Sequence, residues 1–264
     1  MHEDFLGKIM TTKKEELSRF QMPERLIRRK KRSLKKALGH PRHALGLIAE
    51  VKQASPSKGF FRKQLDPDAI ARSYEQAGAD AISVLTDQTY FHGSLENLVK
   101  VVQSVSLPVL RKDFIIDDRQ IEEADRAGAD AILLIAAALD PNQLHEFYLA
   151  AQERHIECLV EVHRPEEADA VLSLFTPEIM GANNRNLKTF KTDLTVTEQI
   201  RKLIPDDVIF IAESGVRRAD DVNYLKMCGA DAALVGETLI RAHSPSDKIR
   251  DLFGGEVSDI APST

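Results

Sequence analysis

Charged side chains follow several short apolar runs in this sequence, and their types suit proton transfer. Glu50 and Lys52 end one run, and their i, i+2 spacing places them on one face of an extended strand. Lys112, Glu161 and Glu213 end three other runs. Lysines and carboxylates that are crowded together can move one another's pKa values apart, which paired acid and base roles require. The sequence therefore predicts acid–base chemistry, with a structural ion-pair network as the alternative for any one residue alone.

An internal repeat indicates which elements carry these groups. The pattern Ala/Cys-Gly-Ala-Asp-Ala begins at residues 77, 127 and 228, and each copy precedes an apolar run that is too short for a helix. Glycine suits the end of a helix, and an unbroken apolar run suits a parallel strand buried on both faces. Five further runs lie between these copies and around them. The eight expected strands cover residues 47–49, 82–85, 109–111, 132–135, 157–160, 179–182, 208–212 and 233–236.

Helical patterns separate the strands, and most of them begin with a capping Asp or Ser or with a first-turn Pro. The expected starts are Asp66, Ser94, Asp117, Asp140, Arg164, Thr195, Arg217 and Ser244. Strict alternation of eight strand–helix units predicts an α/β fold, a (β/α)8 TIM barrel, with an open doubly wound sheet as the alternative. A single domain of 264 residues suits this fold. Residues 46–264 would form the barrel, and residues 1–45 an N-terminal helical extension that could fold back as a lid.

In such a barrel the C-terminal ends of the strands carry the catalytic groups. Seven of the eight expected ends have polar residues or glycine, whereas the strand starts are apolar. Only one of the adjacent pair Lys112 and Asp113 can face inward. Glycines after the last two strands let backbone amides approach an anion, which predicts a phosphate site and a sugar-phosphate ligand.

Composition and motifs argue against several other functions. The net charge is −5, and the nine basic side chains between Arg25 and Arg42 have no aromatic residues among them, so we interpret them as a solvated helical face and expect no nucleic-acid partner. Cys158 and Cys228 form no CxxC motif, and the eight histidines show no metal-ligand spacing. No metal and no cofactor are therefore expected.

Targeting signals are also missing from the sequence. No apolar stretch approaches the ~18 residues that a spanning helix needs, and no secretion signal is present. These features predict a cytoplasmic protein with no membrane partner. We expect a monomer, with a weak homo-oligomer as the alternative.

Several longer motifs resemble the indole-3-glycerol phosphate synthase family, and they extend over nearly the whole chain. They are IAEVKQASPSKG at 48–59, SVLTDQTYFHGS at 83–94, LPVLRKDFIID at 107–117, LVEVH at 159–163, GANNRNLKTF at 181–190, IAESGV at 211–216 and LVGE at 234–237. One departure is Ala182, where a bulkier aliphatic residue is common in the family.

The resemblance implies ring closure of 1-(2-carboxyphenylamino)-1-deoxyribulose 5-phosphate to indole-3-glycerol phosphate, with loss of carbon dioxide and water, in tryptophan biosynthesis. Lys112 would be the general acid for the substrate carbonyl, Glu161 would handle protons in the later dehydration, and Lys52 would meet the substrate carboxylate. The other catalytic positions implied are Glu50, Asn183, Arg185, Glu213 and Ser214. The substrate-binding positions implied are Ser55, Phe91, Phe114, Leu187, Gly215, Gly236 and Glu237, with Phe91, Phe114 and Leu187 around the anthranilate ring.

Two alternatives fit less well. Phosphoribosylanthranilate isomerase would require a catalytic cysteine at the first strand end, where this chain has Glu50. A noncatalytic metabolite-binding barrel would keep the phosphate loops and lose the acid–base set.

Overall fold

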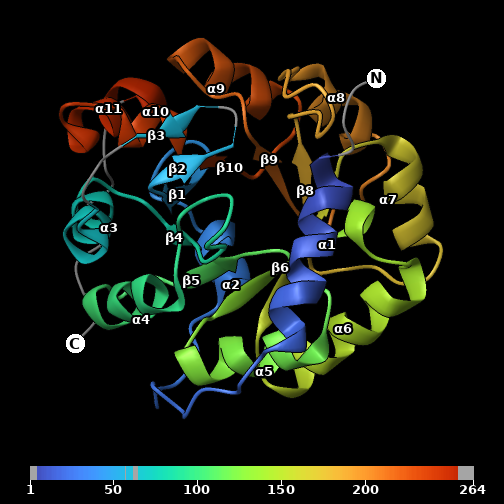
Figure 1. The fold of residues 1–264 in the computed structure, drawn as a ribbon. Helices are drawn as coiled ribbons and strands as arrows, with labels where there is room; N and C mark the ends of the chain where they lie inside the picture. The colour runs from blue at the N-terminus through green and yellow to red at the C-terminus, as the bar shows by residue number, and fades with distance from the viewer. Residues whose placement is uncertain (1–4, 57, 62–64, 255–264) are drawn as a thin grey trace.

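The computed structural model describes residues 5–56, 58–61 and 65–254, and its centre is a closed barrel of parallel strands (Figure 1). Strands that follow one another along the chain pair side by side, and the last pairs with the first. This confirms the predicted (β/α)8 barrel, with strand ends within two residues of those expected. The strands are β1 (Gly46–Val51), β4 (Ala81–Leu85), β5 (Val109–Lys112), β6 (Ala131–Ile135), β7 (Glu157–Val162), β8 (Ile179–Asn183), β9 (Ile209–Glu213) and β10 (Ala232–Val235).

Helices surround the barrel, and side chains of the expected capping residues start five of them. Asp66, Ser94, Asp117, Asp140 and Ser244 each accept a hydrogen bond from a first-turn backbone N–H. The outer helices are α3 (Pro67–Gln76), α4 (Leu95–Ser104), α5 (Asp118–Ala127), α6 (Pro141–Glu153), α7 (Pro165–Leu172), α8 (Thr195–Arg201), α9 (Ala219–Met227) and α11 (Pro245–Phe253). None of the helices in the described ranges is both long enough and apolar enough to cross a bilayer.

Some connections differ from the sequence prediction. The helix expected to start at Arg217 begins slightly later, with Arg218 as the N-cap and Ala219 as the first helical residue, and the Asp221 carboxylate accepts hydrogen bonds from the backbone N–H groups of Arg217 and Arg218 at this start. A short antiparallel hairpin, β2 (Ala54–Ser55) and β3 (Gly59–Phe60), follows β1. A single 3-10 turn, η1 (Ala136–Ala138), follows β6, and the short helix α10 (Glu237–Ile240) follows β10.

The Ala/Cys-Gly-Ala-Asp repeat joins neighbouring strands at the N-terminal end of the barrel. The glycine of each copy has a positive φ, between 82° and 95°, which ends the preceding helix. The aspartate then accepts a hydrogen bond from a backbone N–H of the neighbouring strand. The pairs are Asp80 with Leu47, Asp130 with Val109 and Asp231 with Phe210, at 2.8 to 2.9 Å. The repeat is therefore structural, and it leaves the opposite end of the barrel for chemistry.

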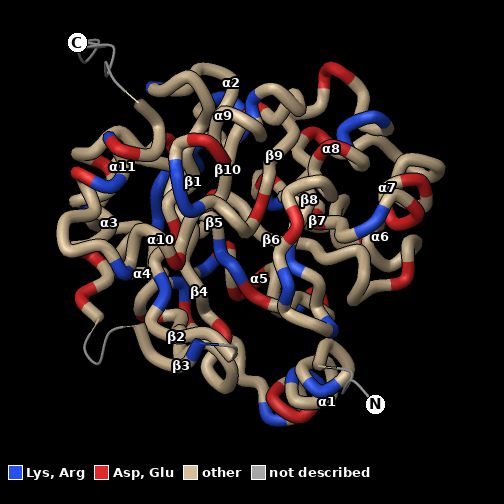
Figure 2. Tube along the Cα trace, turned by 90° about the horizontal axis from the view of Figure 1, so that it is seen from above, with Lys and Arg blue, Asp and Glu red and all other residues tan. Residues whose placement is uncertain are grey.

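The N-terminal extension is not helical throughout, which corrects the expectation for residues 1–45; residues 1–4 lie outside the described part. Two helices, α1 (Phe5–Ser18) and α2 (Leu34–Gly39), lie at opposite ends of the barrel (Figure 2). Leu34 and Leu38 are buried among the inward-facing apolar residues of the strands. Helix α2 therefore closes the N-terminal end, and α1 is left at the C-terminal end.

The basic segment between Arg25 and Arg42 is also not a solvated helical face. Residues 19–33 contain no helix, and several cations of the segment pair with acidic groups near the N-terminal end of the barrel. The pairs are Arg29 with Asp130 at 2.6 Å, Lys31 with Asp125 at 2.9 Å and Lys35 with Glu178 at 2.8 Å. Charge complementarity thus holds this segment against the barrel.

Candidate active site

The C-terminal ends of the strands surround a cavity of about 440 Å³. All fifteen site residues expected from the sequence line this cavity. They reach it from seven of the eight strand ends or from the loops that follow, because parallel strands in a closed barrel present all their C-terminal ends on one side.

Lys112 is at the centre of the charged groups. Its Nζ lies 3.3 Å from Oε2 of Glu161 and 3.3 Å from Oε2 of Glu213. Burial by itself would lower the pKa of Lys112, but the Glu161, Glu213 and Glu50 carboxylates outweigh it, so the pKa is raised. Of the adjacent pair, Lys112 reaches these carboxylates and Asp113 pairs instead with Lys13. Lys112 is therefore a fixed cation in the empty cavity and can donate a proton where negative charge develops.

The two carboxyl groups beside Lys112 differ in charge. Burial and the nearby Glu161 carboxylate raise the pKa of Glu213 to about 8. Burial would also raise the pKa of Glu161, but Lys112 and His163 outweigh it, and that pKa is lowered. The two pKa values are therefore shifted in opposite directions, and a proton is held more tightly on Glu213 than on Glu161. Gly181 makes room for this group, since a Cβ there would overlap Oε1 of Glu213.

Glu50 and Lys52 form a second charged group on the β1 side. Lys52 Nζ lies 2.6 Å from Oε1 of Glu50. Burial by itself would raise the pKa of Glu50, but Lys52 and Lys112 outweigh burial, so the pKa is lowered. A Cβ on Gly236 would overlap Oε1 of Glu50 and lie 2.8 Å from Lys52 Nζ. Gly236 thus leaves space for this ion pair, a role that the sequence reading did not assign to it.

The end of β8 carries two asparagines that face different surroundings. Asn183 lines the cavity, and its Oδ1 accepts from the backbone N–H of Arg185 at 3.0 Å. Asn184 is buried outside the cavity lining, and its side-chain amide donates to the carbonyl oxygens of Glu213 and Ser214 at 3.1 and 3.2 Å. Asn184 therefore fixes the ends of β8 and β9 relative to each other.

The loop after β9 has an unusual backbone. Ser214 and Gly215 both have positive φ, 64° and 100°, and a non-glycine residue at such an angle costs about 1–2 kcal/mol. Ser55 and Glu237 line the cavity as well, together with the cations Arg217 and Arg241. Sequence reasoning missed these two arginines because they follow the strand ends at a distance rather than ending an apolar run. Ser57, which belongs to the sequence motif at 48–59, lies outside the described residues.

Aromatic and aliphatic side chains line another part of the cavity. The rings of Phe91 and Phe114 are 6.2 Å apart, and Leu187 also lines this region. Helix α1 contributes Phe5, Leu6 and Ile9, which the sequence reading did not name. The i, i+4 spacing of Phe5 and Ile9 was the available signal for an apolar face on α1. The structure thus places α1 over the cavity, where the sequence had allowed for a lid.

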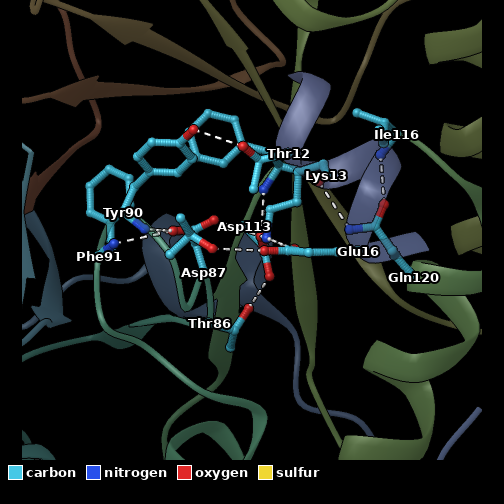
Figure 3. A network of polar contacts seen from close by, with 12 residues as sticks. Thr12, Lys13, Glu16, Thr86, Asp87, Tyr90, Phe91, Asp113, Ile116 and Gln120 are labelled. Carbon is cyan, nitrogen blue, oxygen red and sulfur yellow. Dashed lines mark hydrogen bonds and ion pairs between the residues drawn. The ribbon is translucent and has the colours of Figure 1, made fainter. Parts of the chain in front are cut away.

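A buried cation fastens α1 at this position (Figure 3). Lys13 Nζ lies 2.9 Å from Oδ2 of Asp87 and 3.0 Å from Oδ1 of Asp113, and its side chain is only 5% exposed. We call these three residues the Lys13 anchor. Asp87 also accepts hydrogen bonds from the backbone N–H groups of Tyr90 and Phe91, at 2.7 and 3.1 Å. The anchor therefore links the extension to the turn that presents Phe91.

Solved structures with low sequence identity share the fold. The 3-hexulose-6-phosphate synthase from Salmonella typhimurium superposes with a TM-score of 0.63 at 12% identity, covering 78% of this chain and 95% of that chain. The N-acetylmannosamine-6-phosphate 2-epimerase from Clostridium perfringens gives 0.61 at 13% identity, covering 85% and 96%. At these identities the likeness extends to the barrel alone.

Curated relatives are much more similar. Indole-3-glycerol phosphate synthase from Halalkalibacterium halodurans is 53% identical over 251 residues, covering 95% of this chain and 97% of the relative. The enzyme of the same name from Shouchella clausii is 52% identical over 248 residues, covering 94% and 97%. A sequence model of the indole-3-glycerol phosphate synthase family matches residues 5–252. With this match and these identities over nearly its full length, the chain belongs to the indole-3-glycerol phosphate synthase family.

Proposed function

We propose that this chain closes 1-(2-carboxyphenylamino)-1-deoxyribulose 5-phosphate to indole-3-glycerol phosphate and releases carbon dioxide and water, as a carbon–carbon lyase of tryptophan biosynthesis. Family membership identifies the reaction. The observation that supports it best is the Lys112 ammonium, held 3.3 Å from the carboxyl groups of Glu161 and Glu213 in a cavity with an aromatic region.

The cavity offers a separate place for each part of this substrate. In our proposal the anthranilate ring packs against Phe91, Phe114 and Leu187, under the apolar face of α1. The phosphate lies toward the loops after β1, β9 and β10, where amides and hydroxyls can donate to it. The groups assigned to it are Ser55, Ser214, Gly215, Gly236 and Arg241, and Asn183, Arg185 and Glu237 line the space between the two ends.

Condensation forms the new carbon–carbon bond. The ring carbon that bears the carboxylate attacks the ketone carbon, and the carbonyl oxygen takes a proton from the Lys112 ammonium. The bond to the carboxylate then breaks, carbon dioxide leaves, and its electron pair restores the aromatic ring. Lys52 meets this carboxylate, and Glu50 holds the side-chain amine of Lys52, with Oε1 2.6 Å from Nζ.

Dehydration completes the indole. The new hydroxyl leaves with a proton as water, and the adjacent carbon loses a proton to give the ring double bond. Glu161 is placed to accept that proton, because it is the ionised member of the pair. All these steps use side chains of the chain and no metal or cofactor, so extensive dialysis against a chelator should leave the rate unchanged.

The test is turnover of the synthetic substrate, followed by indole fluorescence. Lys112→Ala should slow the condensation step by roughly 100-fold or more, whereas Glu161→Gln should accumulate an intermediate because the dehydration step is slowed. Lys100→Ala, on the exposed face of α4, is the matched control and should behave as wild type. Absence of an indole product with wild-type protein, or normal turnover in a folded Lys112→Ala variant, would refute the proposal.

We also propose that the protein acts as a monomer in the cytoplasm. In the described part of the chain, the large exposed apolar side chains are dispersed over the surface rather than gathered on one element: Leu26, Phe60, Leu149, Leu174 and Met227. Both cysteines are free thiols, which suits a reducing compartment. Light scattering of the purified protein would distinguish the monomer from a weak homo-oligomer.

A further inference from the structure

His163 lies beside the acid–base set but does not line the cavity. It follows β7 at i+2 from Glu161, so the two side chains share one face of the strand. Its Nε2 lies 3.4 Å from Oε1 of Glu161, and its Nδ1 lies 3.7 Å from Oε2 of Glu167. The imidazole is buried, with 8% of the side chain exposed. A carboxylate oxygen thus faces each ring nitrogen, so an N–H on either nitrogen points toward a carboxylate.

Glu167, on α7, keeps the ring in this position. Its carboxylate accepts a hydrogen bond from the backbone N–H of His163 at 2.7 Å and pairs with the Arg164 side chain at 2.9 Å. The same carboxylate thus holds the backbone of His163 and lies 3.7 Å from its ring. The imidazole lies between Glu167 and Glu161.

The surroundings of Glu161 and Glu213 differ chiefly at His163. Lys112, from β5, is equally distant from both carboxyl groups, at 3.3 Å, so it does not favour one over the other. Glu161 and Glu213 also interact with each other. His163 lies against Glu161. The imidazole is thus one source of asymmetry between two carboxyl groups that lie equally far from Lys112.

We propose that His163 is a positioning residue that keeps the negative charge on Glu161 and the shared proton on Glu213. The inference rests on the proposed function, in which Glu161 is the base of the dehydration step. Without the imidazole the proton would distribute over both carboxyl groups, and Glu161 would be ionised in only part of the molecules. The substrate pocket itself would not change, because His163 is outside its lining.

The first test is the pH dependence of turnover in His163→Asn. Loss of the ring nitrogen that faces Glu161 should move the acidic limb of the kcat profile to higher pH by about one pH unit. At a pH on the acidic limb itself, below the pKa of Glu161 in both proteins, this corresponds to a roughly tenfold lower kcat. KM should stay within about twofold of the wild-type value. Glu167→Gln keeps the side-chain size and loses the charge that holds the ring, so it should shift the limb in the same direction by less.

The matched control is His155→Asn. His155 is exposed at the turn before β7 and has a φ of 56°, a conformation that asparagine tolerates. It should leave the profile unchanged. A fall in kcat of His163→Asn that is equal at every pH, or an unshifted acidic limb in a variant folded by circular dichroism, would overturn the inference.

A second readout needs no turnover and so separates this inference from the proposed function. Difference infrared spectroscopy at pH 7 reports the stretch of a protonated carboxyl group. Adding Glu213→Gln to otherwise wild-type protein should remove that band, and adding Glu161→Gln should not. In the His163→Asn background, both substitutions should reduce it. If the band depends on Glu213 alone in both backgrounds, His163 does not place the proton, whatever reaction the protein catalyses.

Discussion

Replacing Lys13 with methionine should release α1 from the barrel, because it removes the charge of the Lys13 anchor and keeps the length of the side chain. The side chains of Lys13, Asp87 and Asp113 are at most 5% exposed. Asp113 would retain Arg111 at 3.2 Å, while Asp87 would keep the backbone donors of Tyr90 and Phe91. One buried carboxylate is thus left without a cation.

The expected cost follows from that count. Breaking a buried ion pair by removing one partner destabilises a protein by about 3–5 kcal/mol, and the remaining donors of both aspartates place this case near the lower end, about 3 kcal/mol. At 1.4 kcal/mol per tenfold, α1 should open roughly 100-fold more often. The pKa of Lys13 is raised, since Asp113 and Asp87 outweigh burial, so the contribution is fully present at pH 7 and is lost only at strongly alkaline pH.

Limited proteolysis after α1 and urea unfolding at pH 7 measure this change, and KM should rise because Phe5, Leu6 and Ile9 leave the cavity. The neighbouring Lys14→Met is the matched control, since Lys14 is exposed. Adding Asp87→Asn to Lys13→Met should recover part of the loss, as the uncompensated charge is then gone. If Lys13→Met is cleaved at the wild-type rate and its free energy of unfolding is within about 0.5 kcal/mol of the wild-type value, the reasoning is refuted.

Three other predictions follow from the structure. Glu213→Gln should flatten the pH dependence of stability. The pKa of Glu213 is raised to about 8, so its contribution to wild-type stability is present at acidic pH and is lost as pH rises from about 5 to 8. Urea unfolding at several pH values would measure this. Gly236→Ala should lower kcat more than it weakens substrate binding, because the added Cβ meets the Glu50–Lys52 pair. Gly39→Ala, with open space around the glycine, is the control. A loss of substrate affinity alone would instead favour contact between the Gly236 amide and the phosphate as the main role of this glycine. Leu38→Ala should lower the free energy of unfolding by about 2–5 kcal/mol, whereas Leu26→Ala, at an exposed position, should lower it little. Removing residues 1–45 should therefore leave no stably folded barrel, although every barrel strand lies beyond them. A truncated protein that unfolds cooperatively would contradict this.

The barrel and its catalytic rim were readable from local patterns. Short unbroken apolar runs after glycine, such as the one from Ala131 to Ile135, have few solutions other than buried parallel strands, and their alternation with capped helices specifies the barrel. Once parallel strands close, their C-terminal ends meet on one side. Residues as distant in sequence as Glu50 and Glu213 could therefore be grouped before any distance between them was known.

The N-terminal extension was harder to read, because its role depends on surfaces that other segments create. Leu34 and Leu38 become core residues only because the barrel has an open N-terminal end to fill. Lys13 looks like one lysine of a charged helix until Asp87 and Asp113 enclose it. The basic segment near Arg29 resembles a solvated helical face until Asp130 is placed beside it.

The charge states of the site depended entirely on tertiary structure. In the sequence, Glu161 and Glu213 are equivalent: each is a carboxyl group at the end of an apolar run. In the folded barrel both are buried against Lys112, and His163 lies against Glu161, so the pKa of Glu161 is lowered and that of Glu213 is raised. Sequence patterns determine which residues end a strand, because burial follows local periodicity. A pKa is determined by desolvation and by charges within a few ångströms, and those distances exist only after strands far apart in the chain have come together.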